Sequence, residues 1–357
     1  MIRQEGDRMI EIYICHQYGE PSHVEALYKC QDMYKYKIGK YIILDLKAIF
    51  LETLRMIIME KRIIKAFRWL GIHLIDRFEL RFVRDKVLVV GLAPYDNLML
   101  KFSKVFKQNY SIYHTSYPIW DGSRFHRGRI KNKSKFETCL KECFNAVACV
   151  NNESYKQIAT WFPKAQIVNH AIDVDNYKTR AVYEKTKRVN YVFIGRLVSE
   201  KNIEIILEYW KKHQNSNISI SFIGEGYLQK EIESVAKMDS RVRYLGKWTK
   251  EKIKNHLCNF HFLILPSKRE LFGVVLLEAL AAGIPSIVSN TSGPLEIIRN
   301  GENGLIFELE DSVSFDRIMK RSYDMDENEY MSMCLQARAD SKKYSYEVIA
   351  KKWMELL

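Results

Sequence analysis

No part of the sequence is apolar over a length that would cross a membrane. The longest run without a charged residue, positions 279–295, is interrupted by glycine, proline, serine and asparagine, whereas a membrane-spanning helix needs about 20 predominantly apolar residues. The first eight residues are largely polar and lack the apolar core of a secretory signal. These two absences lead us to expect a cytoplasmic protein.

The sequence also lacks the cysteine spacing of a zinc site. Its seven cysteines form no Cys-x-x-Cys pair. Cys139 and Cys143 stand four positions apart, and no further cysteine or histidine pair completes a set of four ligands. We therefore expect free thiols in a reducing compartment and no structural zinc.

What the sequence does have is length, apolar content and positive charge. Its 357 residues are too many for one ordinary core and suit two domains. With 47% apolar and 28% charged residues, the composition is that of a globular chain. The net charge of +13 favours an anionic partner: a nucleic acid, an anionic lipid or a phosphorylated substrate.

Short apolar runs of strand length alternate with helical stretches in both halves of the chain. This alternation predicts an α/β fold with two Rossmann-like, doubly wound domains. The expected strands are residues 9–15, 86–92, 110–115, 146–150, 189–194, 218–223, 242–245, 261–265 and 286–289.

Residues 35–70 mix basic and large apolar residues at helical spacing. Helices of this composition are typical of surfaces that lie on an anionic membrane. The alternative is that the apolar residues belong to an ordinary core and the basic ones to a solvated face. We expect membrane contact and no nucleic acid, because the sequence contains no nucleic-acid recognition motif. The basic residues are Lys35, Lys37, Lys40, Lys47, Arg55, Lys61, Arg62, Lys65 and Arg68.

One carboxylate interrupts a strongly apolar stretch of helical length. Residues 274–282 are apolar at every position except Glu278, and a buried charge is unfavourable unless it is paired or hydrogen-bonded. Glu270 stands eight positions earlier, in the expected loop before this helix. Two carboxylates beside the positive end of a helix suit a ligand with hydroxyl groups and phosphate, such as a sugar nucleotide. The spacing alone also allows a solvated Glu270 and a Glu278 that pairs with a lysine.

A compact pair of cations follows the expected strand 189–194. Gly195 and Arg196 come directly after this strand, and Lys201 stands five positions after Arg196. Arginine offers a planar pair of donors and lysine a point charge, and both suit a diphosphate. The alternative is ordinary surface charge at the start of a helix.

The two glutamates and their surroundings resemble the Glu-x7-Glu signature of the retaining glycosyltransferases of family 4, which are group 1 glycosyl transferases with the GT-B fold. The likeness extends over residues 266–285, and the loop 195–202 is similar to the family pattern Gly-Arg-Leu…Lys-Gly, with Asn202 in place of the second glycine. By motif order the resemblance covers residues 189–306. It implies two Rossmann-like domains that face a cleft, with the last helix crossing back to the first domain.

The resemblance also implies the domain limits. A segment that usually closes the first domain is matched at residues 167–173 by Ile172 and Asp173. We therefore expect an acceptor-binding domain at 1–175, a charged linker at 176–188 and a donor-binding domain at 189–340. The C-terminal helix is expected within 341–357.

Individual roles also come from the resemblance. Arg196 and Lys201 would hold the diphosphate. Glu270 would hold the sugar, and Glu278 the ribose. His114, at the end of an expected strand, would lie near the transferred sugar and act in catalysis with Arg196, Lys201 and Glu270. The other expected donor-binding residues are Gly19, Gly195, Gly224, Gly246, Lys247, Leu271, Phe272, Gly273 and Val274.

The implied activity is that of a retaining hexosyltransferase. It would move a sugar from a nucleoside diphosphate, UDP in preference to GDP, to a saccharide or lipid-linked acceptor in bacterial polysaccharide or lipopolysaccharide synthesis. Because the two cations supply positive charge, we expect no metal and no cofactor. Together with the segment 35–70, this favours a place at the inner face of the cell membrane. The alternatives are a GT-B epimerase and a non-catalytic membrane-binding protein with a degenerate nucleotide site.

Overall fold

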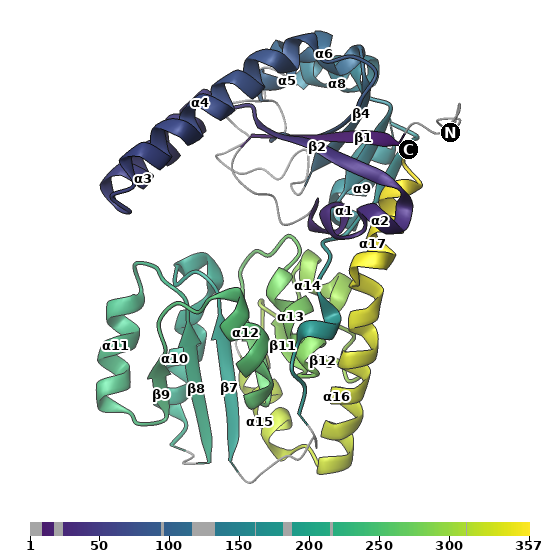
Figure 1. Ribbon diagram of the computed structural model, residues 1–357. Helices are drawn as coiled ribbons and strands as arrows, with labels where there is room; N and C mark the ends of the chain where they lie inside the picture. Colours follow the sequence, from purple (N-terminus) through teal and green to yellow (C-terminus); the bar gives the residue numbers. More distant parts are fainter. Residues whose placement is uncertain are drawn as a thin grey trace. The chain divides into compact units, whose positions relative to one another are not determined.

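The chain is built from two six-stranded parallel sheets, each in a unit of its own (Figure 1). The computed structural model describes residues 9–17, 24–93, 96–115, 133–160, 162–180, 188–214, 217–311 and 313–357. The first unit comprises residues up to Ala171 together with Tyr346–Leu357, and the second comprises Ile172–Ser345.

The sheet of the first unit has helices on both faces. Its strand order is β2-β1-β3-β4-β5-β6. Alternate residues of β3 point in opposite directions, so that Leu88 and Val90 enter a core with α5, α6, α8 and α9, while Val87 and Val89 enter a core with α1 and α17. The strands are β1 Ile10–His16, β2 Tyr36–Ile43, β3 Val87–Gly91, β4 Tyr110–Thr115, β5 Ala146–Cys149 and β6 Ala165–Ile167. The helices are α1 Glu25–Lys29, α2 Gln31–Tyr34, α3 Leu46–Ile58, α4 Ile63–Glu79, α5 Asn97–Lys101, α6 Ser103–Lys107, α8 Lys133–Cys143, α9 Asn152–Ala159 and α17 Tyr346–Met354, with the 3₁₀ turn η2 Leu80–Phe82.

The last helix, α17, belongs to the first unit. Ile349, Ala350 and Trp353 are buried in the core that contains Val87 and Val89. The Tyr110 hydroxyl donates a hydrogen bond of 2.7 Å to the carbonyl oxygen of Leu356. The expected return of the C-terminal helix to the first domain is therefore confirmed.

The second unit has the strand order β12-β11-β10-β7-β8-β9. Residues Tyr191 and Phe193 of β7 pack on one face of the sheet in a large core with α10, α11, α15 and α16. The strands are β7 Val189–Ile194, β8 Ile218–Ile223, β9 Val242–Tyr244, β10 Phe262–Leu265, β11 Ser286–Ser289 and β12 Gly304–Phe307. The helices are α10 Ile203–Lys212, α11 Gln229–Met238, α12 Lys250–His256, α13 Val274–Ala282, α14 Ser292–Ile297, α15 Ser314–Asp324 and α16 Glu327–Ser341. The 3₁₀ turns are η4 Val174–Asn176, η5 Ser199–Lys201, η6 Leu257–Asn259 and η7 Lys342–Tyr344.

The limits of the units differ from the expected ones at both ends. The second unit begins at Ile172 and ends at Ser345, where we expected 189–340. The described part of the expected linker is anchored in this unit, because the Lys178 N–H donates to the Lys254 carbonyl at 3.0 Å. The charge of the stretch 176–188 suggested a linker, but its first residues pack against η6 and α12.

We had expected residues 35–70 to be helical, but the first part of this segment is a strand. Tyr36–Ile43 forms β2, which pairs in parallel with β1. Tyr36, Ile42 and Ile43 are buried, so the helical part of the basic and apolar segment starts at α3. The reason is tertiary: pairing with β1 buries one end of a run whose composition also suits a helix.

All seven cysteines are buried and free, as the spacing predicted. Within the described ranges, no three histidine, cysteine or acidic side chains are grouped as metal ligands would be. In the same part of the chain, each helix is too short or too polar to cross a bilayer.

Candidate active site

The candidate site lies where the strand order of the second sheet reverses. β7 and β10 are neighbours in this sheet although they are far apart in the chain, and both are parallel. The loops that leave their carboxyl ends therefore start side by side. In open α/β sheets, ligands bind at this point of reversal. The loop after β7 contains Arg196 and Lys201, and the loop after β10 contains Glu270.

Lys201 and Glu270 form an ion pair between these two loops. The Nζ atom of Lys201 lies 2.5 Å from Oε2 of Glu270, and the side chains are 16% and 14% exposed. A second link comes from the backbone, where the Lys268 N–H donates to the Glu200 carbonyl at 2.9 Å. Glu270 is therefore a paired, largely buried carboxylate and not a solvated loop charge.

Tyr227, which the sequence analysis missed, helps to hold the turn that carries Lys201. Its hydroxyl accepts from the Ser199 N–H and donates to the Ser199 Oγ, both at 2.8 Å. Ser199 opens the 3₁₀ turn that ends at Lys201. Tyr227 follows the Gly224-Glu225-Gly226 loop after β8, and no spacing pattern links it to Ser199. The lysine is thus positioned by a side chain from the neighbouring loop.

Glycines allow the loops after β7, β8 and β9 to lie close together. Gly224 has φ +142°, and a Cβ atom at this position would stand 1.8 Å from the carbonyl oxygen of Gly195. The Gly224 N–H donates to the Gly246 carbonyl at 3.0 Å, and the Gly195 N–H donates to Ile223. Three of the predicted donor-binding residues are therefore adjacent in the structure.

The N-terminus of α13 opens at the same edge of the sheet. Gly273 precedes the helix with φ +85°, and the first amide groups of a helix have no partner within it and form its positive end. Phe272 is 4% exposed, whereas Leu271 and Val274 are half-buried. The Gly293 N–H donates to the Glu270 carbonyl at 3.1 Å. The backbone amides at the start of α13 and the Glu270 side chain therefore lie together at this edge of the sheet.

Glu278 lies on α13, one turn further along. Its Oε1 atom accepts a hydrogen bond of 3.2 Å from the Tyr177 hydroxyl. Burial raises the pKa of this carboxyl from 4.5 to about 6, against the opposing effects of the Tyr177 bond and of the charges on Lys250 and Lys254. Lys254 is itself bonded to Asp173 at 3.1 Å. Glu278 therefore bonds to a tyrosine, and not to a lysine as the alternative had it. The sequence did not indicate this tyrosine.

The substitution Glu278→Gln is expected to remove a pH dependence of stability. Because the native pKa is raised from 4.5 to about 6, the native state binds more protons than the unfolded state between these values. The contribution of Glu278 is therefore most favourable below pH 4.5, and it falls by about 2 kcal/mol as the pH rises through 6. Urea unfolding at pH 4.5, 6 and 7.5 should show that the free energy of unfolding falls less with rising pH in the variant than in the wild type. A variant that is less stable than the wild type at pH 7.5 would contradict this reasoning.

Two expected cations lie outside the Lys201–Glu270 pair. Arg196 is exposed and makes no ion pair within the described chain. Lys247 follows β9 and pairs with Glu225 at 3.0 Å, with both side chains well exposed. Arg196 is thus available to an anionic ligand, whereas Lys247 is engaged at the surface.

His114 belongs to the first unit, so it is described apart from this group. His114 lies near the end of β4 in the first unit, is 2% exposed and stacks on Trp353 at a ring-centroid distance of 5.5 Å. Burial, together with His170 and His16, holds its pKa well below the ordinary value. The strand end was predicted correctly, but α17 covers the side chain. Gly19 lies outside the described residues.

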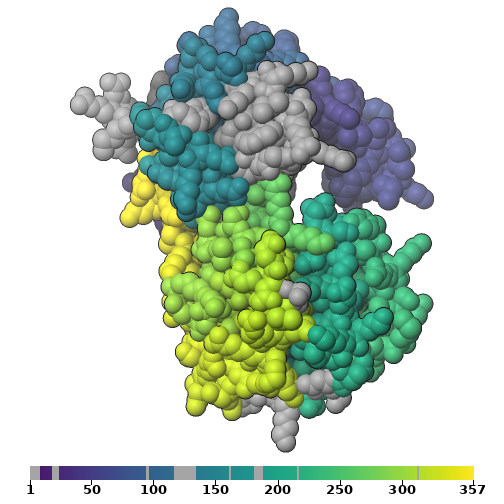
Figure 2. Space-filling view, turned by 180° about the vertical axis from the view of Figure 1, so that it is seen from behind, coloured from purple at the N-terminus to yellow at the C-terminus, as the bar shows by residue number. Residues whose placement is uncertain are grey.

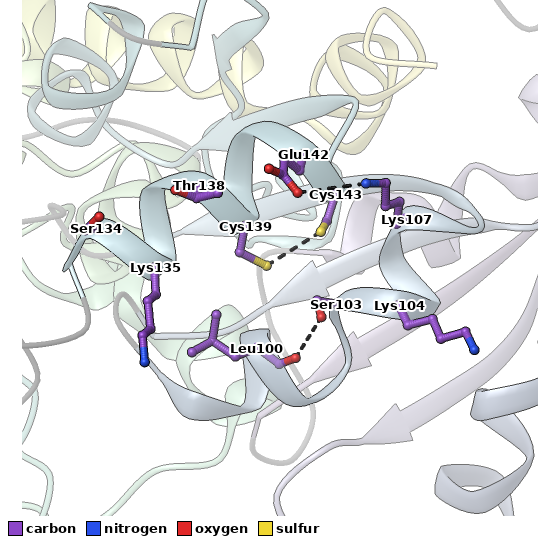
Figure 3. A pocket seen from close by; sticks show the side chains of 10 residues that line it. All are labelled: Leu100, Ser103, Lys104, Lys107, Ser134, Lys135, Thr138, Cys139, Glu142 and Cys143. Atoms are coloured by element: carbon purple, nitrogen blue, oxygen red, sulfur yellow. Dashed lines mark hydrogen bonds and ion pairs between the residues drawn. The ribbon is translucent and has the colours of Figure 1, made fainter.

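A separate cavity of about 460 Å³ lies in the first unit, between α5, α6 and α8 (Figure 3). Lys104, Lys107 and Lys135 stand on its rim. Cys139 and Cys143 lie beside each other in it, with their sulfur atoms 3.7 Å apart. Among the described residues, none of the predicted site residues lines this cavity.

The sequence of the second unit resembles a known protein family. Residues 175–339 match the family model of glycosyl transferases group 1. The matched range contains Arg196, Lys201, Glu270 and Glu278. The predicted resemblance to group 1 glycosyltransferases is thereby confirmed.

One curated relative of this chain is an uncharacterized glycosyltransferase of Methanocaldococcus jannaschii. It is 28% identical over 184 residues, which are 50% of this chain and 51% of the relative. The chain spans about half the length of the first curated relatives that it matches, from 42% to 51%.

Solved structures resemble the chain over nearly its full length. The lipopolysaccharide outer core galactosyltransferase WaaB in its apo form is 14% identical, covers 97% of this chain and 99% of its own, and gives a TM-score of 0.67. The Anabaena protein HepE in complex with UDP and glucose is also 14% identical, covers 97% and 98%, and gives a TM-score of 0.69. The chain therefore has the GT-B fold, as predicted.

Proposed function

We infer that the chain is a retaining glycosyltransferase that moves a hexose-type sugar from a nucleoside diphosphate, with UDP favoured over GDP, to a saccharide or lipid-linked acceptor. The observation that carries this proposal is the Lys201–Glu270 pair at the reversal point of the second sheet. Two similar structures add support, since one is named a lipopolysaccharide galactosyltransferase and the other was solved with UDP and glucose.

The four charged residues would contact three parts of the donor, namely the diphosphate, the sugar and the ribose. Lys201 and Arg196 would neutralise the diphosphate as it departs, which stabilises the charge that develops in the transition state. Glu270 would accept hydrogen bonds from sugar hydroxyls, and the amides of Phe272 and Gly273 would contact the sugar or phosphate. Glu278 would accept bonds from the ribose hydroxyls, each worth about 1.5–3 kcal/mol. His114 would need to leave its stack with Trp353 to reach a sugar.

Retention of configuration is proposed to follow a same-face route. The bond between the sugar and the donor phosphate breaks, the acceptor oxygen forms the new bond on the same face, and the departing phosphate oxygen takes the acceptor proton. This route requires no protein nucleophile, in contrast to double displacement through a carboxylate. Lys201 and Arg196 would supply the positive charge that a divalent metal supplies in other phosphate-transfer sites.

The proposed place of the reaction is the cytoplasmic face of a membrane. Seven free, buried cysteines suit a reducing compartment. A lipid-linked acceptor would lie in the bilayer surface. The assembled product would be a cell-surface polysaccharide or lipopolysaccharide.

A thermal-shift screen with UDP-, GDP- and ADP-sugars tests the donor assignment. A UDP-sugar at 100 times its Kd is expected to stabilise the native state by about 2.7 kcal/mol. The same ligand should give a much smaller shift with Glu278→Ala, because the ribose contacts are lost. An unchanged shift in this variant would contradict the ribose assignment, and no shift with any nucleotide sugar would contradict the proposed function. Incubation with the sugar nucleotide alone would reveal an epimerase by the appearance of an epimer.

A further inference from the structure

Helix α3 carries a row of exposed apolar side chains on the face opposite its core contacts. Ile49, Thr53 and Met56 are the buried residues of this helix. At 3.6 residues per turn, the exposed apolar side chains fall on the other side of it. They are Leu46 (36% exposed), Phe50 (49%), Leu51 (56%), Leu54 (51%) and Ile58 (67%).

Helix α4 repeats this arrangement. Ala66 and Arg77 are buried, and exposed apolar side chains recur at intervals of three or four along another face. Gly71, where an added Cβ would contact nothing, continues the row. The side chains are Ile63 (55% exposed), Ile64 (85%), Phe67 (60%), Ile75 (57%) and Phe78 (56%), followed by Phe82 (68%) in η2.

This concentration of exposed apolar surface is unusual for the chain. Of the 24 large apolar side chains that are exposed among the described residues, 13 lie between Leu46 and Phe82. Scattered exposed apolar residues need no explanation, but a large contiguous group marks an interaction surface. Both helices lie at the outer margin of the first unit, where their purple and blue atoms form its surface (Figures 1 and 2).

The charge between and beside these rows is positive. Residues 46–68 contain six basic and two acidic side chains, and all six basic ones are exposed. The two acids are paired locally, Glu52 with Arg55 at 3.3 Å and Glu60 with Arg62 at 3.0 Å. Lys47, Lys61, Lys65 and Arg68 make no ion pair within the described chain. Their charge is therefore available to an anionic partner.

The acids at the other end of α4 do not offset this charge, because they serve to anchor the helix. Lys40 of β2 lies 2.6 Å from both Asp76 and Glu79. The buried Arg77 donates to the Leu44 carbonyl at 2.8 Å. The helices are thus fixed to the sheet through the C-terminal end of α4, and the apolar rows and the unpaired lysines remain on the outside.

We propose that the surface formed by α3, α4 and η2 docks on an anionic lipid bilayer. The apolar side chains enter the boundary between head groups and acyl chains, and the lysines and arginines lie at the lipid phosphates. A second copy of the chain is a poorer occupant, since it would bring the same positive charges together. The assignment does not depend on the proposed transferase activity, and it shifts the expected segment from 35–70 to Leu46–Phe82.

Co-sedimentation of the full chain with lipid vesicles tests the proposal. The wild type is expected to bind phosphatidylglycerol vesicles at least tenfold more tightly than phosphatidylcholine vesicles, with a loss of binding at high salt. The double variant Ile64→Asp/Phe67→Asp should weaken binding to phosphatidylglycerol at least tenfold. Because both side chains are largely exposed, its Tm and its thermal shift with a UDP-sugar should match those of the wild type.

Matched variants separate a docking surface from a general effect of charge or apolar exposure. Met238→Asp/Leu335→Asp changes two exposed apolar side chains of the second unit and should bind as the wild type does. Lys61→Gln/Lys65→Gln should weaken binding to phosphatidylglycerol and leave the weak binding to phosphatidylcholine unchanged.

Three results would overturn the proposal. The first is wild-type binding that is no tighter to phosphatidylglycerol than to phosphatidylcholine. The second is wild-type binding by Ile64→Asp/Phe67→Asp. The third is a vesicle-free dimer that this variant converts to a monomer in sedimentation velocity, since the occupant would then be a second copy.

Discussion

Replacing Lys201 by alanine is expected to lower donor turnover by about 10²- to 10³-fold, the usual effect of removing one group that stabilises transition-state charge. The Nζ atom lies 2.5 Å from Glu270 at the reversal point of the second sheet, where the diphosphate is proposed to lie. The release of nucleoside diphosphate at saturating donor gives kcat, and titration of the donor gives its affinity.

A double-mutant cycle tests whether Lys201 and Glu270 act together. Removing either member leaves a largely buried charge without its partner, so the losses in Lys201→Ala and Glu270→Ala should not add in the double variant. Lys237→Ala, which removes an exposed lysine of α11, controls for net charge and should retain wild-type turnover. Additive losses, or a Lys201→Ala variant with wild-type kcat, would contradict the assigned role.

Gly224→Ala should destabilise the second unit by about 4 kcal/mol, because strained backbone and overpacking contribute about 1–3 kcal/mol each. The new Cβ would stand 1.8 Å from the carbonyl oxygen of Gly195, at a φ of +142°. One of the two loops must move, so donor binding should be lost as well. Guanidinium unfolding and the donor-induced thermal shift measure the two effects.

Gly246→Ala is the matched control for this substitution. Gly246 also has a positive φ, +68°, but an added Cβ meets no atom within 4 Å. Only the left-handed backbone conformation is then unfavourable, at about 1–2 kcal/mol. Equal destabilisation in the two variants would show that contact with Gly195 is not the cause.

The sequence predicted the second unit better than the first. Arg196, Lys201 and Glu270 each follow a strand with a clear apolar run, and the carboxyl ends of parallel strands meet at one edge of a sheet. The proximity of Lys201 and Glu270 could therefore be predicted without coordinates. The partners Tyr177 and Tyr227 could not, since each comes from a different loop and has no spacing relation to Glu278 or Ser199.

Two local features of the first unit have tertiary causes. The start of the segment 35–70 has a composition that suits a helix, but pairing with β1 makes residues 36–43 a strand. His114 does stand near a strand end, but Trp353 from the last helix covers it. In both cases the deciding contact comes from residues that are distant in the sequence, and a local sequence pattern does not include them.

The return of α17 to the first unit has a consequence for the order of folding during synthesis. The second unit is one continuous stretch, Ile172–Ser345, whereas the first also needs Tyr346–Leu357. One core of the first unit contains Ile349, Ala350 and Trp353, so it cannot be completed until Tyr346–Leu357 has left the ribosome. Domains usually finish folding from the N-terminus onward. Here the order is reversed, because the first unit is completed only after the second unit has been synthesised.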